Sequence, residues 1–124
     1  MKHSSLVAFL DGKMSPAQFS DEIAPEVDEC GASIKATQHG RIIITDGPET
    51  VFTRLRALRL FQAVVDKTLS FEAANYTADC IIMSHTFDWE DDELVGEAIH
   101  FLADDYPPPT EDEIRSVLGR LGSA

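Results

Sequence analysis

Residues 51–65, VFTRLRALRLFQAVV, form the strongest helical pattern in the chain and decide its fold class. The apolar side chains of this stretch recur near the 3.6-residue period of an α-helix, at Val51, Leu55, Leu58, Phe61 and Val65. The segment Asp46-Gly47-Pro48 turns the chain just before it. We therefore expect a long helix here, with one face buried in the core.

Two helices are expected before this stretch. Residues 4–12 predict a short first helix that begins at a serine cap and ends at Gly12, where glycine accepts the left-handed conformation. Ser15 followed by Pro16 is a cap with proline at the first helical position, and it predicts the start of a second helix. Because proline removes a backbone donor, we expect a kink or break in this helix at Pro25.

Three more helices are expected after residue 65. Ser70 and Asp88 are suitable caps for the first two. The prolines at 107–109 force an extended spacer. Thr110 and Glu113 then form a capping box ahead of the last helix.

The region between the second and the long helix has a different pattern. Residues 33–45 are rich in β-branched and alternating side chains around His39-Gly40, which predicts a small β-hairpin. Its second strand, residues 41–45, is apolar without alternation, so helices should cover both of its faces. The fold class expected is α+β, predominantly helical, with about five or six helices around one hairpin (residues 33–45) in a single domain over residues 1–124. If residues 33–45 form only a loop, the alternative is an all-α bundle.

The composition is that of an ordinary folded protein that remains in the cytoplasm. A chain of 124 residues with 44% hydrophobic and 26% charged residues fits one core and excludes a disordered chain. No apolar run approaches the length of about 18 residues that a membrane helix needs, and residues 1–5 do not lead into a signal peptide. The net charge of −12 argues against nucleic acid as a ligand and favours a basic protein partner.

Most of the charge imbalance comes from one window. From Asp88 to Glu113 the chain has eleven acidic residues and no Lys or Arg. Acids near a helix start interact favourably with its dipole and keep a domain in solution, which is one interpretation. The other is a binding face with Trp89 as an anchor, because five acids in six positions repel one another unless a cation compensates them. The partner-binding residues predicted on this basis are Asp88, Trp89, Glu90, Asp91, Asp92, Glu93, Asp104 and Asp105.

The sequence has no complete motif for metal binding or catalysis. A calcium loop begun at Asp88 lacks the required glycine and the final bidentate acid, and Glu97 with His100 is only half of a di-iron unit. We expect no metal and no cofactor. Cys80, with His85 or His100, is the candidate nucleophile, but its apolar surroundings in sequence favour a buried structural thiol, so we expect no enzyme.

The only basic concentration is Arg54, Arg56 and Arg59. Three arginines this close together could bind phosphate. In a protein this acidic, such residues more often pair internally with carboxylates or pack their stems along the apolar stripe. The sequence does not decide between these alternatives.

The segment LVAFLDGKMSPAQF, residues 6–19, resembles the opening of bacterial toxin-immunity proteins of the colicin-immunity type. Residues 73–79, 87–90 and 101–105 are similar in character to immunity-like bacterial proteins. The resemblance implies a small helical cytoplasmic protein that neutralises a cognate toxin, commonly a nuclease, by covering its basic active-site cleft. The acidic window suits that role. The alternatives are an acidic adaptor or regulatory subunit with another basic partner, and a small enzyme that uses Cys80 or a histidine.

Overall fold

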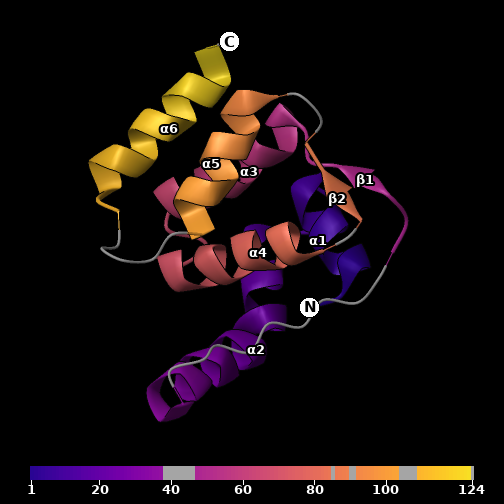
Figure 1. Cartoon of the computed structure of the whole chain (residues 1–124), viewed down its shortest axis with the longest axis vertical. Coiled ribbons are helices and arrows are strands. Elements are labelled where there is room, and N and C mark those ends of the chain that lie inside the picture. The colour runs from indigo at the N-terminus through magenta and orange to yellow at the C-terminus, as the bar shows by residue number, and fades with distance from the viewer. Residues whose placement is uncertain (38–46, 85, 90–91, 104–108, 124) are drawn as a thin grey trace.

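The computed structural model describes residues 1–37, 47–84, 86–89, 92–103 and 109–123. These residues form a predominantly helical α+β fold, as the sequence predicts (Figure 1). Its elements are α1 (His3–Leu10), α2 (Pro16–Thr37), β1 (Thr50–Val51), α3 (Arg54–Val65), α4 (Phe71–Met83), β2 (Phe87–Asp88), α5 (Glu93–Ala103) and α6 (Glu111–Ser123).

The sheet of the described residues is parallel and short. Thr50 of β1 lies opposite Phe87 of β2, and Val51 lies opposite Asp88. Backbone hydrogen bonds run from Thr50 N to Thr86 O at 2.8 Å and from Phe52 N to Asp88 O at 2.7 Å. This pairing places the start of α3 beside the start of α5.

The hairpin expected over residues 33–45 is wrong in its first half, since residues 33–37 are the last part of α2. Residues 38–45, with the strand expected at 41–45 and its helical cover, lie outside the described residues. The physical reason is that five alternating residues are too few to distinguish a strand from a helix. A helix that has already formed gains one backbone hydrogen bond for each residue added to its end.

Side-chain caps start α2, α3, α4 and α6, and Asp92 Oδ1, which accepts from Val95 N at 3.4 Å, caps α5. Ser15 and Gln18 form a reciprocal capping box at α2, with backbone-to-side-chain distances of 3.2 and 3.1 Å. Ser70 Oγ accepts from Ala73 N at 3.1 Å at the start of α4, as expected. The predicted box at α6 is present: Thr110 N donates to Glu113 Oε1 at 3.1 Å, and Glu113 N donates to Thr110 Oγ1 at 3.2 Å. At α3 the cap is Thr53, whose side chain accepts from the backbone N of residue 56 at 3.2 Å.

Three expected helix features are wrong. α1 begins at His3, before either serine, and its cap position Lys2 makes no side-chain hydrogen bond. α2 continues through Pro25, so the break expected there as an alternative to a kink is wrong. α5 begins at Glu93 rather than after Asp88, because the backbone of Asp88 is paired in β2.

The apolar stripe expected on α3 is also shifted. Leu55 is 59% exposed and Val51 is 39% exposed, whereas Ala57, Leu60 and Phe61 are fully buried. Val51 belongs to β1, so the helix starts later than the pattern assumed. The core face of α3 is therefore set by the residues that meet α6, α5 and α1.

Each of the six helices in the described part of the chain contributes buried apolar residues to one core. α3 packs against α6, α4 packs against α5 and α2, and α1 packs against both α2 and α3. Figure 1 shows α6 at one end of the molecule and α2 at the other, with the β1–β2 pair on one side. At the α1–α2 corner the rings of Phe9 and Phe19 stack with centroids 4.4 Å apart.

Candidate functional site

Four of the eight predicted partner-binding residues lie among the described residues, and they form one corner of the fold. Asp88 ends β2, Trp89 follows it, and Asp92 and Glu93 open α5. The other four predicted residues, Glu90, Asp91, Asp104 and Asp105, lie outside the described residues. We call the corner formed by Asp88, Trp89, Asp92 and Glu93, together with Val51 of β1 and Leu55 of the first turn of α3, the β2–α5 face.

Trp89 is held against the first turns of α5. Its indole lies over Gly96, where a Cβ would be 2.9 Å from the indole nitrogen. The imidazole of His100 meets the indole edge-on at 5.7 Å, and His100 is itself bonded through Nδ1 to Gly96 O at 2.8 Å. Trp89 is therefore a partly buried aromatic whose position the helix fixes, which is the kind of side chain that serves as an interface anchor.

Asp92 is a structural carboxylate. It accepts two hydrogen bonds from Arg54, from Nε at 2.7 Å and from Nη2 at 3.2 Å. It also accepts from Val95 N at 3.4 Å at the start of α5. The hydrogen bond from Arg54 is the main reason that the pKa of Asp92 lies below its usual value. This bidentate ion pair links the start of α5 to the start of α3.

Arg56 is likewise used inside the molecule. Its guanidinium donates to both carboxylate oxygens of Asp11, at 2.8 and 3.2 Å, and to the backbone carbonyl of Val51. The hydrogen bond from Arg56 is the largest cause of the lowered pKa of Asp11. Of the two interpretations of the arginines, internal pairing holds for Arg54 and Arg56.

Arg59 packs on the backbone of Gly12. A Cβ at Gly12, which has φ of +77°, would overlap the Arg59 guanidinium and lie 2.9 Å from its Cζ. Among the described residues, the Nη1 of Arg59 is buried without a hydrogen-bond partner. The charge of Arg59 helps to lower the pKa of Asp11. Arg59 therefore packs α3 against the corner between α1 and α2.

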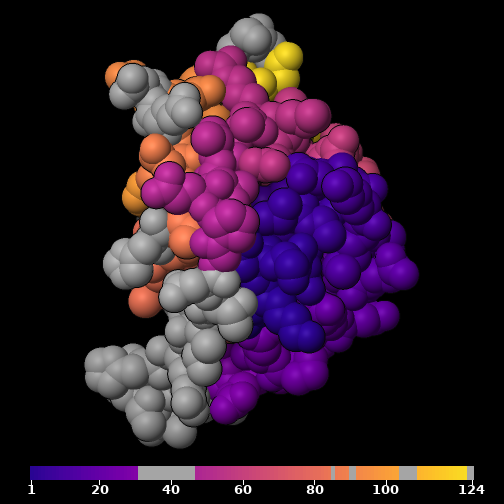
Figure 2. Space-filling model, turned by 90° about the vertical axis from the view of Figure 1, so that its right-hand side faces the viewer, coloured from indigo at the N-terminus to yellow at the C-terminus, as the bar shows by residue number. Residues whose placement is uncertain are grey.

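Two exposed apolar side chains complete the β2–α5 face. Val51 lies opposite Asp88 in the sheet, and Leu55 follows Arg54, which is bonded to Asp92. Figure 2 shows this side of the molecule, with the magenta atoms of β1 and the start of α3 next to orange atoms of the later chain. Sequence reasoning missed this pair because the helical pattern assigned both residues to a buried stripe.

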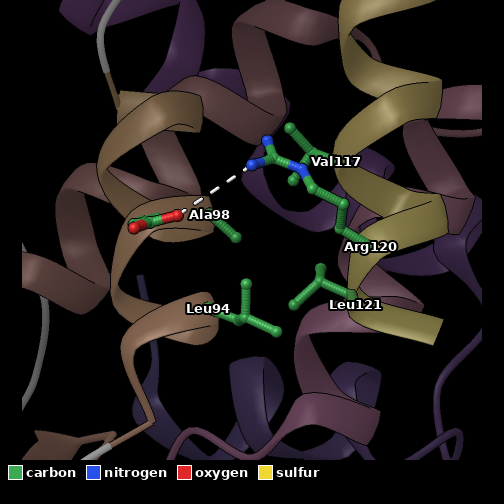
Figure 3. A pocket seen from close by; sticks show the side chains of 6 residues that line it. Leu94, Ala98, Val117, Arg120 and Leu121 are labelled. Atoms are coloured by element: carbon green, nitrogen blue, oxygen red, sulfur yellow. Dashed lines mark ion pairs between the residues drawn. The ribbon is translucent and has the colours of Figure 1, made fainter. Parts of the chain in front are cut away.

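The rest of the acidic window is partly compensated. Glu111 accepts from Arg115 Nη2 at 3.0 Å, and Glu97 pairs with Arg120 Nη1 across the α5–α6 contact at 4.0 Å (Figure 3). Glu113 serves in the capping box of α6. The acidic surface therefore carries less uncompensated negative charge than the composition of the window suggests.

The described residues bear on the expected absence of a metal site and on the candidate nucleophile Cys80. They contain no group of three or more His, Cys, Asp or Glu side chains that could hold a metal ion. Cys80 is fully buried, and desolvation raises the pKa of its thiol to about 12, so it stays protonated at neutral pH. His85 lies outside the described residues. None of the helices found in the described part of the chain could cross a membrane.

Comparison of the chain with protein-family models, with curated proteins and with solved structures gives no match. The case for a function therefore rests on the site itself and on the resemblance at residues 6–19.

Proposed function

We propose that this protein is an acidic binding protein whose β2–α5 face docks on a basic protein partner. The observation that carries the proposal is the exposed apolar side chain of Val51, which lies opposite Asp88 in the sheet, together with the exposed Leu55 in the first turn of α3. An apolar centre bordered by charge is the usual anatomy of a protein interface. The proposed face contains no arginine free to bind an anion among the described residues, since Arg54 is committed to Asp92.

The two kinds of side chain have different roles in this proposal. Val51, Leu55 and Trp89 supply the apolar contact that is removed from water on docking, and this contact provides most of the affinity. Asp88 and Glu93, both exposed, accelerate encounter with a positively charged surface. The partner should therefore present an apolar residue within a ring of Lys or Arg side chains.

We further propose that the partner is a cognate bacterial toxin, of the nuclease class, whose basic cleft this face covers. A nuclease cleft is positive because it holds phosphates, so it is complementary to the acidic window. The resemblance of residues 6–19 to colicin-type immunity proteins supports this assignment. Those residues form the α1–α2 corner, which Arg56 and Arg59 tie to α3, so in this proposal they support the fold and the toxin contacts the β2–α5 face. An acidic adaptor or regulatory subunit would use the same face for another basic protein.

The test pairs growth rescue with affinity. The chain is co-expressed with a candidate nuclease toxin, sought first among the products of the neighbouring genes, and the equilibrium binding of the two purified proteins is measured. Leu55→Ser should weaken binding at least about tenfold, because it removes an apolar contact from the centre of the interface. Ala24→Ser, which also puts serine at an exposed helical position, on α2, should change binding less than about twofold.

Rescue by the parent protein and by Ala24→Ser, with loss of rescue by Leu55→Ser, is the expected pattern. If the toxin is not bound but a basic protein from the same operon is, the adaptor replaces the immunity protein as the function. If Leu55→Ser binds either partner as tightly as the parent does, the interface lies elsewhere.

A further inference from the structure

His3 joins the start of α1 to the β1–β2 pair, and the proposed function gives it no role (Figure 1). The residue is only 4% exposed. Its ring lies against Phe87 of β2 with centroids 5.0 Å apart, and its Nε2 lies 3.3 Å from Thr50 Oγ1 of β1. Because Thr50 and Phe87 are partners in the sheet, one imidazole contacts both strands at the same pair.

The next pair along the sheet belongs to the β2–α5 face. Successive residues of a strand point to opposite faces, so Val51 and Asp88 point outward where Thr50 and Phe87 point inward. The burial of these side chains agrees, since Phe87 is buried whereas Val51 and Asp88 are exposed. His3 therefore supports from inside the sheet whose outer side carries part of the proposed docking surface.

The neighbours of His3 decide which ring nitrogen takes up a proton. The hydroxyl of Thr50 donates to Pro48 O at 2.9 Å, so toward His3 it can only accept. We therefore assign the hydrogen of the neutral ring to Nε2, which leaves Nδ1 to be protonated at acidic pH. A Cβ at Gly47 would overlap the ring at Nδ1. The positive charge would thus form against the backbone of residue 47 rather than in water.

Burial governs the response of this ring to pH, because it disfavours the charged form and lowers the pKa of His3. Charged side chains adjoin its contacts on each element that it touches, and all are exposed to solvent, which screens them. They are Lys2 before α1, Glu49 before β1 and Asp88 of β2. The amine of Met1 is paired with Glu26 of α2. A charged His3 ring is therefore accommodated best when it reaches water.

We propose that protonation of His3 opens the β1–β2 pair and so speeds the release of a partner from the β2–α5 face; the second half of this inference rests on the proposed function. The pair is suited to local opening because each strand has only two residues. The ion pair of Arg54 with Asp92 persists in the opened state, since the pKa of Asp92 lies below its usual value and the carboxylate stays charged at about pH 5. The starts of α3 and α5 therefore stay together while Val51 and Asp88 separate.

Amide hydrogen exchange of the protein without a partner tests the opening. The amides of Thr50 and Phe52 donate across the sheet, and they should be at least about tenfold less protected than the amide of the buried Ala74 in α4, because the pair opens before the rest of the fold. Between pH 7 and 5 their protection, corrected for intrinsic exchange, should fall at least about fivefold. The reason is that each pH unit between the higher open-state pKa and the lower closed-state pKa of His3 favours opening by up to about tenfold. In His3→Gln, which does not take up a proton, this fall should be absent.

Dissociation of the bound partner tests the second half. At about 0.5 M salt, which suppresses the general attraction between the charges, the dissociation rate constant should rise at least about fivefold from pH 7 to 5 in the parent and less than about twofold in His3→Gln. The same pH dependence in both proteins overturns the link to the β2–α5 face.

The exchange measurement also separates this inference from the proposed function. Protection at Thr50 and Phe52 that does not depend on pH, or that equals the protection of Ala74, overturns the opening even where a partner binds. Exchange that behaves as expected, without binding of any basic protein, leaves the opening standing and overturns the proposed function. If His3→Gln does not fold, the pH profile of the parent alone decides.

Discussion

Gly12 and Arg59 depend on each other at the corner between α1 and α2. Gly12 has a left-handed φ of +77°, and the Arg59 guanidinium occupies the space that a Cβ would take. Gly12→Ala should therefore destabilise the protein by about 1–3 kcal/mol, from backbone strain together with the displaced guanidinium. The measurement is equilibrium unfolding in urea.

Gly119→Ala is the matched control for that variant. Gly119 lies in α6 with open space where a Cβ would point, so alanine there should stabilise the protein by about 0.5–1 kcal/mol through helix propensity. Opposite signs for the two glycines are the expected result. A neutral or stabilising Gly12→Ala would contradict the packing of Arg59 on Gly12.

His3 is a buried histidine whose pKa lies below 6.5 because burial disfavours the charged ring. Its ring contacts Phe87 at 5.0 Å between centroids, and Nε2 lies 3.3 Å from Thr50 Oγ1. Since the folded-state pKa is depressed, the stability that neutral His3 contributes is complete above pH 6.5. It is lost as the pH falls toward the lower, folded-state pKa, because the unfolded chain binds the proton more readily.

His3→Gln is the comparison that isolates this effect, because the other histidines are common to both proteins. The free energy of unfolding of the parent, relative to that of His3→Gln, should be constant from about pH 7 to 8 and should fall between about pH 6.5 and 5. The measurement is urea unfolding at each pH. A difference that stays constant down to pH 5 would show that His3 does not titrate abnormally.

At the scale of elements, the β2–α5 corner depends on the contact between Trp89 and Gly96. Because Trp89 is the only tryptophan in the chain, its fluorescence reports on this contact alone. Gly96→Ala places a methyl group 2.9 Å from the indole nitrogen, so the ring should move outward into water. The expected result is a red-shifted emission and easier quenching by acrylamide, while the circular dichroism of the helices is retained. An unchanged emission spectrum would mean that the indole does not rest on α5.

Sequence patterns located the elements whose start signals are local, and the structure confirms the caps at Ser15, Ser70 and Thr110. Each of these helices begins at a side chain that satisfies a backbone N–H within three residues, so no distant contact is needed to place it. The predicted start of α3 was wrong for the opposite reason. Its start is set by the pairing of β1 with β2, which brings Val51 opposite Asp88 from a distant part of the chain. No local pattern encodes that parallel pairing.

The same distinction applies to the site. Counting charges found the acidic window, but it could not show that Asp92 is bonded to Arg54, because the two residues meet only in the folded state. The helical period also concealed Val51 and Leu55, which the structure places on the surface. Of the predicted binding residues that the structure describes, Asp88, Trp89 and Glu93 keep the proposed role of contacting a partner, and Asp92 has a structural one.

At the scale of the whole molecule, the net charge of −12 attracts any basic protein, wherever on the surface it docks. A slower association after charge reversal therefore does not by itself locate the interface. Two double variants with the same change in net charge separate location from overall attraction. Asp88→Lys with Glu93→Lys changes the β2–α5 face, and Asp21→Lys with Glu22→Lys changes exposed positions on α2.

The association rates of these two variants with the cognate partner, at low salt and at about 0.5 M salt, show whether the partner docks on the β2–α5 face. The charge reversal at residues 88 and 93 should slow association at least about tenfold at low salt, and the reversal at 21 and 22 should slow it less than about threefold. High salt should remove most of the difference. Equal rates for the two variants at low salt, with both proteins folded, would contradict a binding face at the β2–α5 corner.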